Sequence, residues 1–283
     1  MSETLIEIRG VHKEYHVDGG ASVNALNGVD LEIKTNEFVC VVGPSGCGKT
    51  TLLNIIAGLE PFDTGSVTMH GIPIVGPGPD RGVIFQQYAL FPWMTVRKNI
   101  EYGMKFLRKP VPVEHPNGKT GEGVRKTRMV PYGKEEKRKM ADHYIKMVNL
   151  TGFEDSYPKA LSGGMKQRVA IARAYALNSD VLLMDEPFGA LDAQTRAQLQ
   201  EDLLSTWEKE KKTAFFITHD VDEAVLLATR VVIMSARPGQ IKEIVDIDLP
   251  YPRNQATKLD AAFNTYKNYI WDIVYKMYLE IPK

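Results

Sequence analysis

The chain lacks the features that mark secreted scaffolds, membrane-spanning subunits and strongly charged proteins. Its 283 residues include two cysteines, and no apolar run approaches the roughly 20 residues needed to cross a bilayer. The first residues have neither the basic nor the apolar segment of a secretion signal, so we expect none. Lys plus Arg and Asp plus Glu are equal at 35 each, which leaves no overall charge to attract nucleic acid or an anionic membrane. We therefore expect no disulfide framework, and we expect any membrane role to depend on partner proteins.

What the chain does contain is a glycine-rich loop between a predicted strand and a predicted helix. Residues 38–42 are apolar on both faces, as in the central strand of a covered sheet, and residues 49–57 are predicted to be helical. The loop fits G-x-x-x-x-G-K-[ST], in which backbone N–H groups cradle phosphates, the Lys reaches the β- and γ-phosphates and the hydroxyl binds Mg²⁺. The candidate ATP-binding residues are Gly43, Ser45, Gly46, Cys47, Gly48, Lys49, Thr50 and Thr51, with Thr50 also a Mg²⁺ ligand. We expect Cys47 to contribute to the loop through its backbone, and its thiol is in addition a candidate for alkylation that ATP would block.

Two more apolar runs, residues 181–185 and 214–217, read as buried strands that end in polar side chains. In open α/β sheets, ligands bind outside the carboxyl ends of the strands. Asp185 is a candidate Mg²⁺ ligand, because Mg²⁺ takes few protein carboxylates and keeps several waters. The adjacent Glu186 is the candidate general base for the water that attacks the γ-phosphate. The sequence thus supplies one carboxylate for a metal ion and one for a water molecule.

Residues 161–168 read LSGGMKQR and precede a predicted helix over residues 165–176. Ser162 is a preferred helix N-cap, and Gly163 and Gly164 allow a ligand to approach the backbone closely. Together with the phosphate loop, this string resembles the signature sequence of the ABC ATPase family, and the resemblance covers roughly residues 5–249. It implies an α/β fold, a P-loop ABC-type ATPase with a RecA-like core, an antiparallel β subdomain and a helical subdomain. In this family the signature residues bind the γ-phosphate of the nucleotide that a second copy holds.

By the same resemblance, smaller motifs receive roles in the site, and the implied cofactors are ATP and Mg²⁺. Gln86 resembles the glutamine that senses Mg²⁺ and water, as a catalytic and metal-binding residue, and Gln87 is the competing choice. His219 resembles the histidine that contacts the γ-phosphate, although a lone histidine is more often structural. Asp192 resembles the aspartate of the loop that crosses the dimer interface, and Tyr15 resembles the aromatic residue that stacks on adenine.

The resemblance divides the chain into an ATPase domain, residues 1–250, and a C-terminal helical tail, residues 251–283. A helical subdomain covers about residues 96–176 and contains an insertion at about 108–131. Valines on either side of Asn117-Gly118 predict a protruding β-hairpin in this insertion. The insertion is then either a mobile surface loop or an arm that contacts a partner or lipid headgroups.

The tail is predicted to form an amphipathic helix that Pro282 would end. The opposite face carries mixed rather than mainly basic charge, which disfavours binding along a membrane surface. We expect the apolar face to pack on the chain's own domain or on a second copy. Its residues are Phe263, Tyr266, Ile270, Ile273 and Met277.

Within the family, residues 86–93, 235–241 and 248–250 resemble importer subunits for nitrate, sulfonate and taurine. This implies an ATP-hydrolysing subunit at the cytoplasmic face of the cell membrane, acting with a second copy of itself, an integral membrane permease and, indirectly, an extracytoplasmic solute-binding protein. The solute would be small and anionic. The alternatives are a subunit of an exporter, or a soluble ABC ATPase that acts on nucleic acid or ribosomes. A single cassette, no cysteine cluster and zero net charge disfavour the nucleic-acid alternative.

Overall fold

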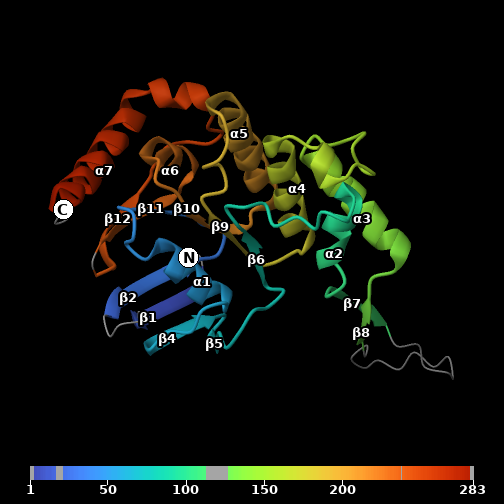
Figure 1. Ribbon diagram of the computed structural model, residues 1–283, viewed down its shortest axis with the longest axis horizontal. Helices are drawn as coiled ribbons and strands as arrows, with labels where there is room; N and C mark the ends of the chain where they lie inside the picture. The colour runs from blue at the N-terminus through green and yellow to red at the C-terminus, as the bar shows by residue number, and fades with distance from the viewer. Residues whose placement is uncertain (1–2, 17–21, 113–126, 237, 281–283) are drawn as a thin grey trace, which may run out of the picture. The chain divides into compact units, whose positions relative to one another are not determined.

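The computed structural model describes residues 3–16, 22–112, 127–236 and 238–280, which belong to two compact units (Figure 1). The first unit spans residues 1–89 and 179–283, and the second spans residues 90–178. In the described part of the chain, no helix is both long and apolar enough for a membrane span.

A six-stranded sheet forms the centre of the first unit, with the strand order β12-β11-β3-β10-β9-β6. Only the edge strand β12 runs antiparallel to its neighbour. Ile217 pairs with Asp185 on one side and with Val41 on the other, so these strands reach the same sheet edge together. The strands are β3 (Phe38–Val42), β6 (Arg81–Ile84), β9 (Val181–Asp185), β10 (Thr213–Ile217), β11 (Arg230–Ser235) and β12 (Gln240–Asp246).

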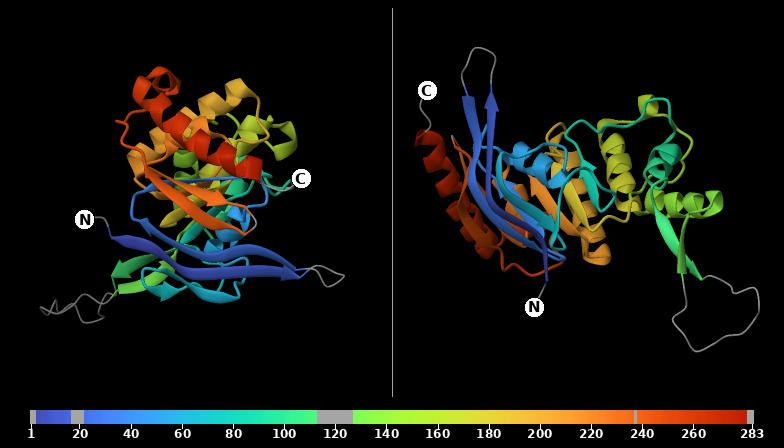
Figure 2. Two further views of the ribbon diagram at one scale, coloured as in Figure 1. Left: turned by 90° about the vertical axis from the view of Figure 1, so that its left-hand side faces the viewer. Right: turned by 90° about the horizontal axis from the view of Figure 1, so that it is seen from below.

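The second sheet of this unit is antiparallel, in the order β2-β1-β4-β5, and α1 (Lys49–Ala57) packs between the two sheets in one apolar core (Figure 2). Its strands are β1 (Thr4–His16), β2 (Ser22–Lys34), β4 (Thr64–Met69) and β5 (Ile72–Pro73). β1 and β2 extend beyond the short patterns typical of strands that can be read in the sequence at residues 5–11 and 31–33. Their pairing contains several register shifts, and the alternation is broken at the first of them, where the neighbouring residues Leu5 and Ile6 are both buried.

Helices cover the other face of the six-stranded sheet. They are α5 (Ala193–Glu210), α6 (Val221–Leu227) and α7 (Ala261–Glu280), with the short η2 (Gln255–Leu259) before α7. Phe38 and Phe216 point to this side, and Phe38 meets Trp207 of α5 edge to face at 5.6 Å. The tail helix α7 contacts α6 and β11, so it packs on its own unit. Its buried residues are Phe263, Ile270 and Met277.

The second unit is a helical group with a strand pair at one end. It contains α2 (Val96–Gly103), β7 (Arg108–Pro112), β8 (Thr127–Pro131), α3 (Lys134–Met147), η1 (Pro158–Ala160) and α4 (Gly163–Ala176). The buried Asn99 fixes the segment before α2, because its amide donates to the carbonyl oxygens of Phe91 and Met94. β7 and β8 pair antiparallel, as the predicted hairpin requires, whereas the predicted turn at Asn117-Gly118 lies outside the described residues. A mostly parallel sheet, an antiparallel sheet and a helical unit confirm the expected fold class.

Candidate functional site

The phosphate loop connects β3 to α1, and no side chain caps the first backbone N–H groups of this helix. Gly48 precedes α1 with φ +87°, and a Cβ there would lie 2.5 Å from the carbonyl oxygen of Ala25. Only glycine fits both this conformation and this close approach. The first turn of α1 has no acidic residue, so nothing in that turn neutralises the positive end of the helix dipole. A helix N-terminus of this kind is suited to a phosphate group.

Lys49 places a positive charge inside the same loop. Its Nζ donates to the carbonyl oxygens of Gly43 at 2.8 Å and Pro44 at 3.1 Å, and the side chain is buried. These two bonds fix the ammonium group beside the loop backbone. Of the remaining predicted loop residues, Ser45, Gly46 and Thr50 are exposed and Thr51 is half-buried. The loop therefore combines backbone donors, a held cation and exposed hydroxyl groups.

The environment of the Cys47 thiol does not favour the alkylation for which the sequence made it a candidate. Its side chain is fully buried in the core between the two sheets, and its Sγ lies 3.6 Å from the Nζ of Lys49. Burial raises the pKa of this thiol, and the nearby ammonium group only partly opposes that effect. Alkylation needs an accessible thiolate, so the structure argues against it. The backbone of Cys47 is the part available to a phosphate.

Thr50 and Asp185 meet although they are 135 positions apart in the sequence. The Thr50 hydroxyl donates to Oδ1 of Asp185 at 3.2 Å. Burial raises the pKa of Asp185, the Thr50 hydrogen bond lowers it, and the charge of Glu186 raises it again. No group of three or more His, Cys, Asp or Glu side chains suited to a metal ion occurs among the described residues. One hydroxyl and one carboxylate oxygen fit Mg²⁺, which keeps most of its ligands as water and phosphate oxygens.

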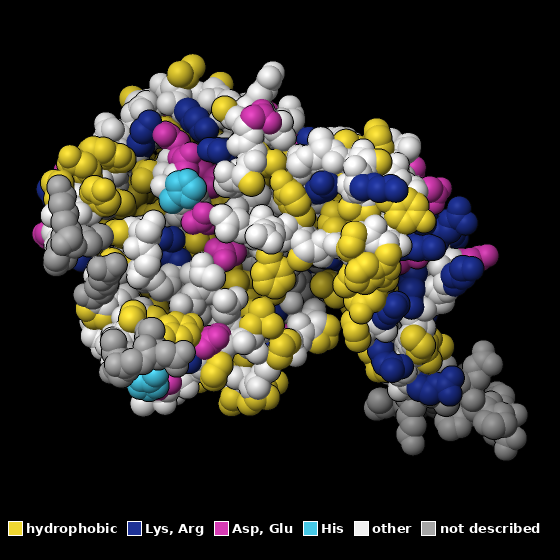
Figure 3. Space-filling model, viewed as in Figure 1, with side chains coloured by type: hydrophobic (Ala, Val, Ile, Leu, Met, Phe, Trp, Pro, Cys, Tyr) yellow, Lys and Arg dark blue, Asp and Glu magenta, His cyan; other side chains and the backbone are white. Residues whose placement is uncertain are grey.

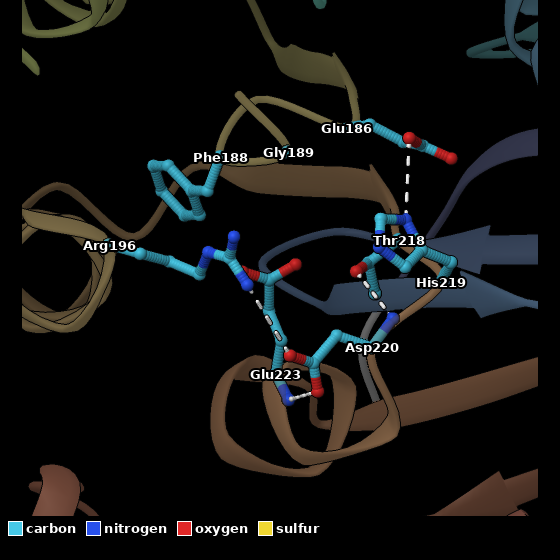
Figure 4. Close-up of a pocket in the computed structure, with 8 residues that line it drawn as sticks. All are labelled: Glu186, Phe188, Gly189, Arg196, Thr218, His219, Asp220 and Glu223. Atoms are coloured by element: carbon cyan, nitrogen blue, oxygen red, sulfur yellow. Dashed lines mark hydrogen bonds and ion pairs between the residues drawn. The ribbon is translucent and has the colours of Figure 1, made fainter. Parts of the chain in front are cut away.

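Glu186 lies one residue beyond the end of β9, between two other predicted site residues, of which Figure 4 shows His219. Its Oε2 is 3.4 Å from Nδ1 of His219 and 3.5 Å from Nε2 of Gln86. The side chain of His219 is 64% exposed and that of Glu186 is 26% exposed, so both remain open to a ligand. The structure thus groups Gln86, rather than Gln87, with Glu186 and His219.

His219 also lines a small pocket of mixed polarity, whose lining includes two residues that the sequence did not single out, Arg196 and Glu223 (Figure 4). Arg196 donates to the carbonyl oxygen of Leu191 at 3.0 Å. Glu223 is buried, and its Oε1 accepts a hydrogen bond from Nε2 of Gln200 at 2.8 Å. The sequence does show that Arg196 and Gln200, the partner of Glu223, lie four residues apart and therefore on one face of a helix. The same spacing also occurs on exposed helix faces, so it could not have identified these residues as part of a site.

Asp192 and Tyr15, two of the predicted site residues, contact neighbouring residues of their own elements. The Asp192 carboxylate caps α5 by accepting from the backbone N–H of Thr195 at 2.9 Å. This hydrogen bond lowers the pKa of Asp192. Tyr15 lies near the end of β1 with the Nζ of Lys13 4.9 Å from its ring centre. Tyr15 as a whole is 37% exposed. These contacts neither use nor block the roles expected from the sequence.

The LSGG segment belongs to the second unit and begins α4. The Ser162 hydroxyl accepts from the backbone N–H of Met165 at 3.3 Å, as an N-cap does, and Gly163 is the first helical residue. The first turn of α4 contains no acidic residue. Gly164 is buried, whereas Ser162 is exposed and Gly163 half-buried. This helix end is therefore also suited to an anion.

Comparison with known proteins shows the family of the chain. Residues 26–189 match the family described as ABC transporter. An ATP-binding protein of Brucella abortus (strain 2308) is 51% identical over 251 residues, which are 89% of this chain and 88% of that protein. The nitrate import ATP-binding protein NrtD of Synechocystis sp. is 43% identical over 93% of this chain and 91% of its own. The bicarbonate transport ATP-binding protein CmpC of Synechococcus elongatus is 45% identical over 89% of this chain but 35% of its own length.

A solved structure gives the same result for the fold. The dimeric structure of an ATP-binding cassette in a post-hydrolysis state, bound to ADP and Pi, matches with a TM-score of 0.69. It is 31% identical in sequence, and the match covers 87% of this chain and 100% of that chain.

Proposed function

The chain belongs to the ABC transporter family, and we propose that it is the ATP-hydrolysing subunit of an importer that takes up a small anion through a separate membrane permease. The family and the likeness to a cassette bound to ADP and Pi make it an ATP-binding protein and an ATPase. The observation that carries the catalytic part of the proposal is the placement of Glu186 between His219 and Gln86, beside the Thr50–Asp185 pair.

We assign the roles within one chain from the family resemblance, and these positions support the assignment. The loop N–H groups and Lys49 hold the phosphates, and Tyr15 stacks on the adenine. Thr50, Asp185 and Gln86 would hold Mg²⁺, whose chemistry is to neutralise charge on the β- and γ-phosphate oxygens. Glu186 orients and deprotonates the attacking water, and His219 contacts the γ-phosphate and holds the Glu186 carboxylate.

The complete site requires a second copy of the chain. The Ser162–Gly164 backbone of one copy binds the γ-phosphate of the nucleotide held by the other, and Asp192 lies at the same interface. The dimeric cassette structure supports the assembly of two copies. Two ATP molecules would close the dimer, and their hydrolysis would reopen it and drive the permease at the cytoplasmic face of the membrane.

The solute class rests on the relatives. One imports nitrate and another transports bicarbonate, and both of these solutes are small anions. An extracytoplasmic solute-binding protein would deliver the anion to the permease. An exporter or a nucleic-acid ATPase has no support of this kind.

The Glu186→Gln variant tests the catalytic assignment. The amide keeps the size of the side chain but cannot accept a proton, so we expect ATP affinity within about threefold of wild type. Turnover should fall by about 10²-fold or more. Fluorescent-nucleotide titration and phosphate release measure the two quantities. Near wild-type turnover in this variant would contradict the role of Glu186.

The transport assignment needs a separate test. We would isolate tagged Glu186→Gln from its native cells in detergent with Mg²⁺-ATP and identify the associated proteins by mass spectrometry. The proposal predicts a multi-helix permease. Recovery of ribosomal or DNA-bound proteins without a permease would leave the ATPase intact and refute the transporter.

A further inference from the structure

A basic surface lies on the second unit, around the strand pair β7–β8 and the adjoining ends of α2 and α3. Described residues 105–112 and 127–139 contain eight Lys and Arg but two Glu. The whole chain has 35 residues of each sign, so the positive charge is concentrated here rather than spread evenly. Figure 3 shows Lys and Arg side chains gathered along the hairpin and the helix next to it.

Most of these cations have no carboxylate beside them. Lys109 is the exception, since it pairs with Glu136. Arg108 and Arg128 are exposed, and no carboxylate of the described residues lies within ion-pair distance of either one. They come from opposite strands, because Arg128 pairs with Val111, three residues beyond Arg108 on β7. The hairpin therefore presents cations on both of its strands.

Exposed apolar side chains accompany these cations. Phe106 is 64% exposed and lies two residues before Arg108, and Met129 is 56% exposed and directly follows Arg128. Met129 pairs with Pro110 across the hairpin, which leaves it without an apolar neighbour of its size on the opposite strand. Large apolar groups interleaved with Lys and Arg are typical of surfaces that enter the headgroup region of a membrane.

We propose that this basic arm binds the anionic headgroups of a lipid membrane. It consists of Lys105, Phe106, Arg108, Arg128, Met129 and Lys134. The inference rests on the proposed function to the extent that this function places the chain at a membrane. The unpaired cations are attracted to the negative surface potential within about 10 Å of the headgroups. Phe106 and Met129 then enter the layer between headgroups and acyl chains.

The chemistry favours lipid over nucleic acid. Outside this surface the chain has more acidic than basic residues, because removing its eight Lys and Arg and two Glu leaves 27 Lys and Arg against 33 Asp and Glu. The acidic excess on the remainder of the chain would also repel a long polyanion. In addition, Phe106 suits either a base or a lipid layer, whereas the exposed Met129 favours insertion among lipids.

Vesicle binding by the full-length chain tests the arm. The vesicles contain phosphatidylcholine alone or phosphatidylcholine with phosphatidylglycerol, and bound protein is measured by cosedimentation at low and high salt. Each Lys or Arg near an anionic surface strengthens binding about fivefold. We therefore expect Arg108→Glu with Arg128→Glu to weaken binding to the anionic vesicles by about 30-fold or more. Phe106→Ser with Met129→Ser should weaken it by about tenfold.

A matched control carries the same charge change on the first unit. Lys209→Glu with Lys242→Glu alters two exposed lysines that no described carboxylate pairs with, and it should leave vesicle binding unchanged. The solution ATPase rate of every variant checks that the chain is folded. The vesicles contain no permease, so a failure of the transporter assignment would not affect this result.

Three outcomes overturn the proposal. They are equal binding to neutral and anionic vesicles, equal binding by the arm variant and the control variant, and a dependence on Arg108 and Arg128 that occurs with DNA but not with vesicles. Preference for the anionic vesicles that is lost in the arm variant and at high salt supports it.

Discussion

Glu186 has a partly exposed carboxylate and a strained backbone. Its φ is +43°, a left-handed conformation that costs a non-glycine residue about 1 kcal/mol or more. The hydrogen bond from its backbone N–H to the carbonyl oxygen of Ile217, at 3.0 Å, holds this conformation at the end of β9. The strain is therefore maintained by the neighbouring strand, and it sets the direction in which the carboxylate leaves the sheet.

Glu223 is the most deeply buried acid near the site, and burial raises its pKa above the ordinary value of 4.5. A raised pKa in the folded state means that the folded protein holds the proton more tightly than the unfolded chain. The stabilisation is fully present below the ordinary pKa and is lost as the pH rises through the folded pKa. The stability contributed by Glu223 therefore begins to decrease near pH 4.5 and decreases further as the pH rises.

Replacing Glu223 with Gln should therefore flatten the pH dependence of stability. The amide keeps an oxygen for the Gln200 hydrogen bond but has no proton to lose. We expect the free energy of unfolding to fall less between about pH 5 and about pH 8 in Glu223→Gln than in wild type. Urea unfolding at several pH values measures this. Asp185, whose pKa is also raised, is present in both proteins and cancels. Parallel curves for the two proteins would show that Glu223 does not titrate in this range.

At the scale of elements, the C-terminal tail is fastened to the helix that follows His219. Arg253 is 3% exposed and donates from its guanidinium to backbone carbonyl oxygens at the end of α6 and in the segment that follows β12. The oxygens belong to Val225, Leu226, Ala228, Ile247 and Leu249. Since α6 begins one residue after Asp220, this contact also holds the helix beside the site.

A second connection runs from the tail through α5. The side chain of Gln255 donates to Oε1 of Gln200 at 3.1 Å, and Gln200 in turn donates to Glu223. The chain of hydrogen bonds thus extends from η2 to the helix after His219. Because each buried group in it depends on its neighbours, the segment behaves as one polar unit rather than as separate contacts.

Removal of the Arg253 guanidinium should destabilise the protein strongly. Arg253→Met keeps most of the side-chain volume but leaves several buried carbonyl oxygens without donors, each at about 1–3 kcal/mol. We expect a loss of at least about 3 kcal/mol in the free energy of unfolding, measured by chemical denaturation. Arg9→Met is the control, because Arg9 forms only exposed ion pairs with Glu7 and Glu32. Equal midpoints for the two variants would contradict the fastening role of Arg253.

At the scale of the whole molecule, the two predicted parts of the ATP site lie in different units of the chain. The phosphate loop and Glu186 belong to the first unit, and the N-terminus of α4 belongs to the second. A site that needs both from different copies makes dimerisation dependent on ATP. Each bound nucleotide then contacts both chains, so ATP binding brings the two chains together. In the proposed transporter, this closure of the dimer is the movement that drives the permease.

The Ser162→Asp variant tests this dependence. Asp is as good an N-cap as Ser, so α4 should remain intact, but the added negative charge faces the γ-phosphate of the other copy. In the Glu186→Gln background, we expect light scattering to detect a dimer with Mg²⁺-ATP. With Ser162→Asp added, the chain should bind ATP and remain a monomer. A dimer that forms equally well with this change, or without nucleotide, would rule out the shared site.

The parts of this protein that could be predicted from sequence are those governed by neighbouring residues. Local backbone preferences and spacing within a few residues predict the succession of strand, glycine loop and helix around Lys49. They also predict the Ser162 cap of α4 and the two carboxylates at the end of β9. The hairpin strands and the apolar face of α7 follow in the same way, because alternation and helical periodicity are short-range patterns.

Other features depend on residues that are far apart in the chain, and no local pattern contains them. The burial of Cys47, the bonds of Arg253 and the contact of Gln200 with Glu223 arise when sheets and helices pack. The full lengths of β1 and β2 depend on partner strands that continue the pairing through register shifts. Local sequence therefore specifies which chemical groups are present and on which elements, whereas their burial, pKa and partners are set by long-range packing.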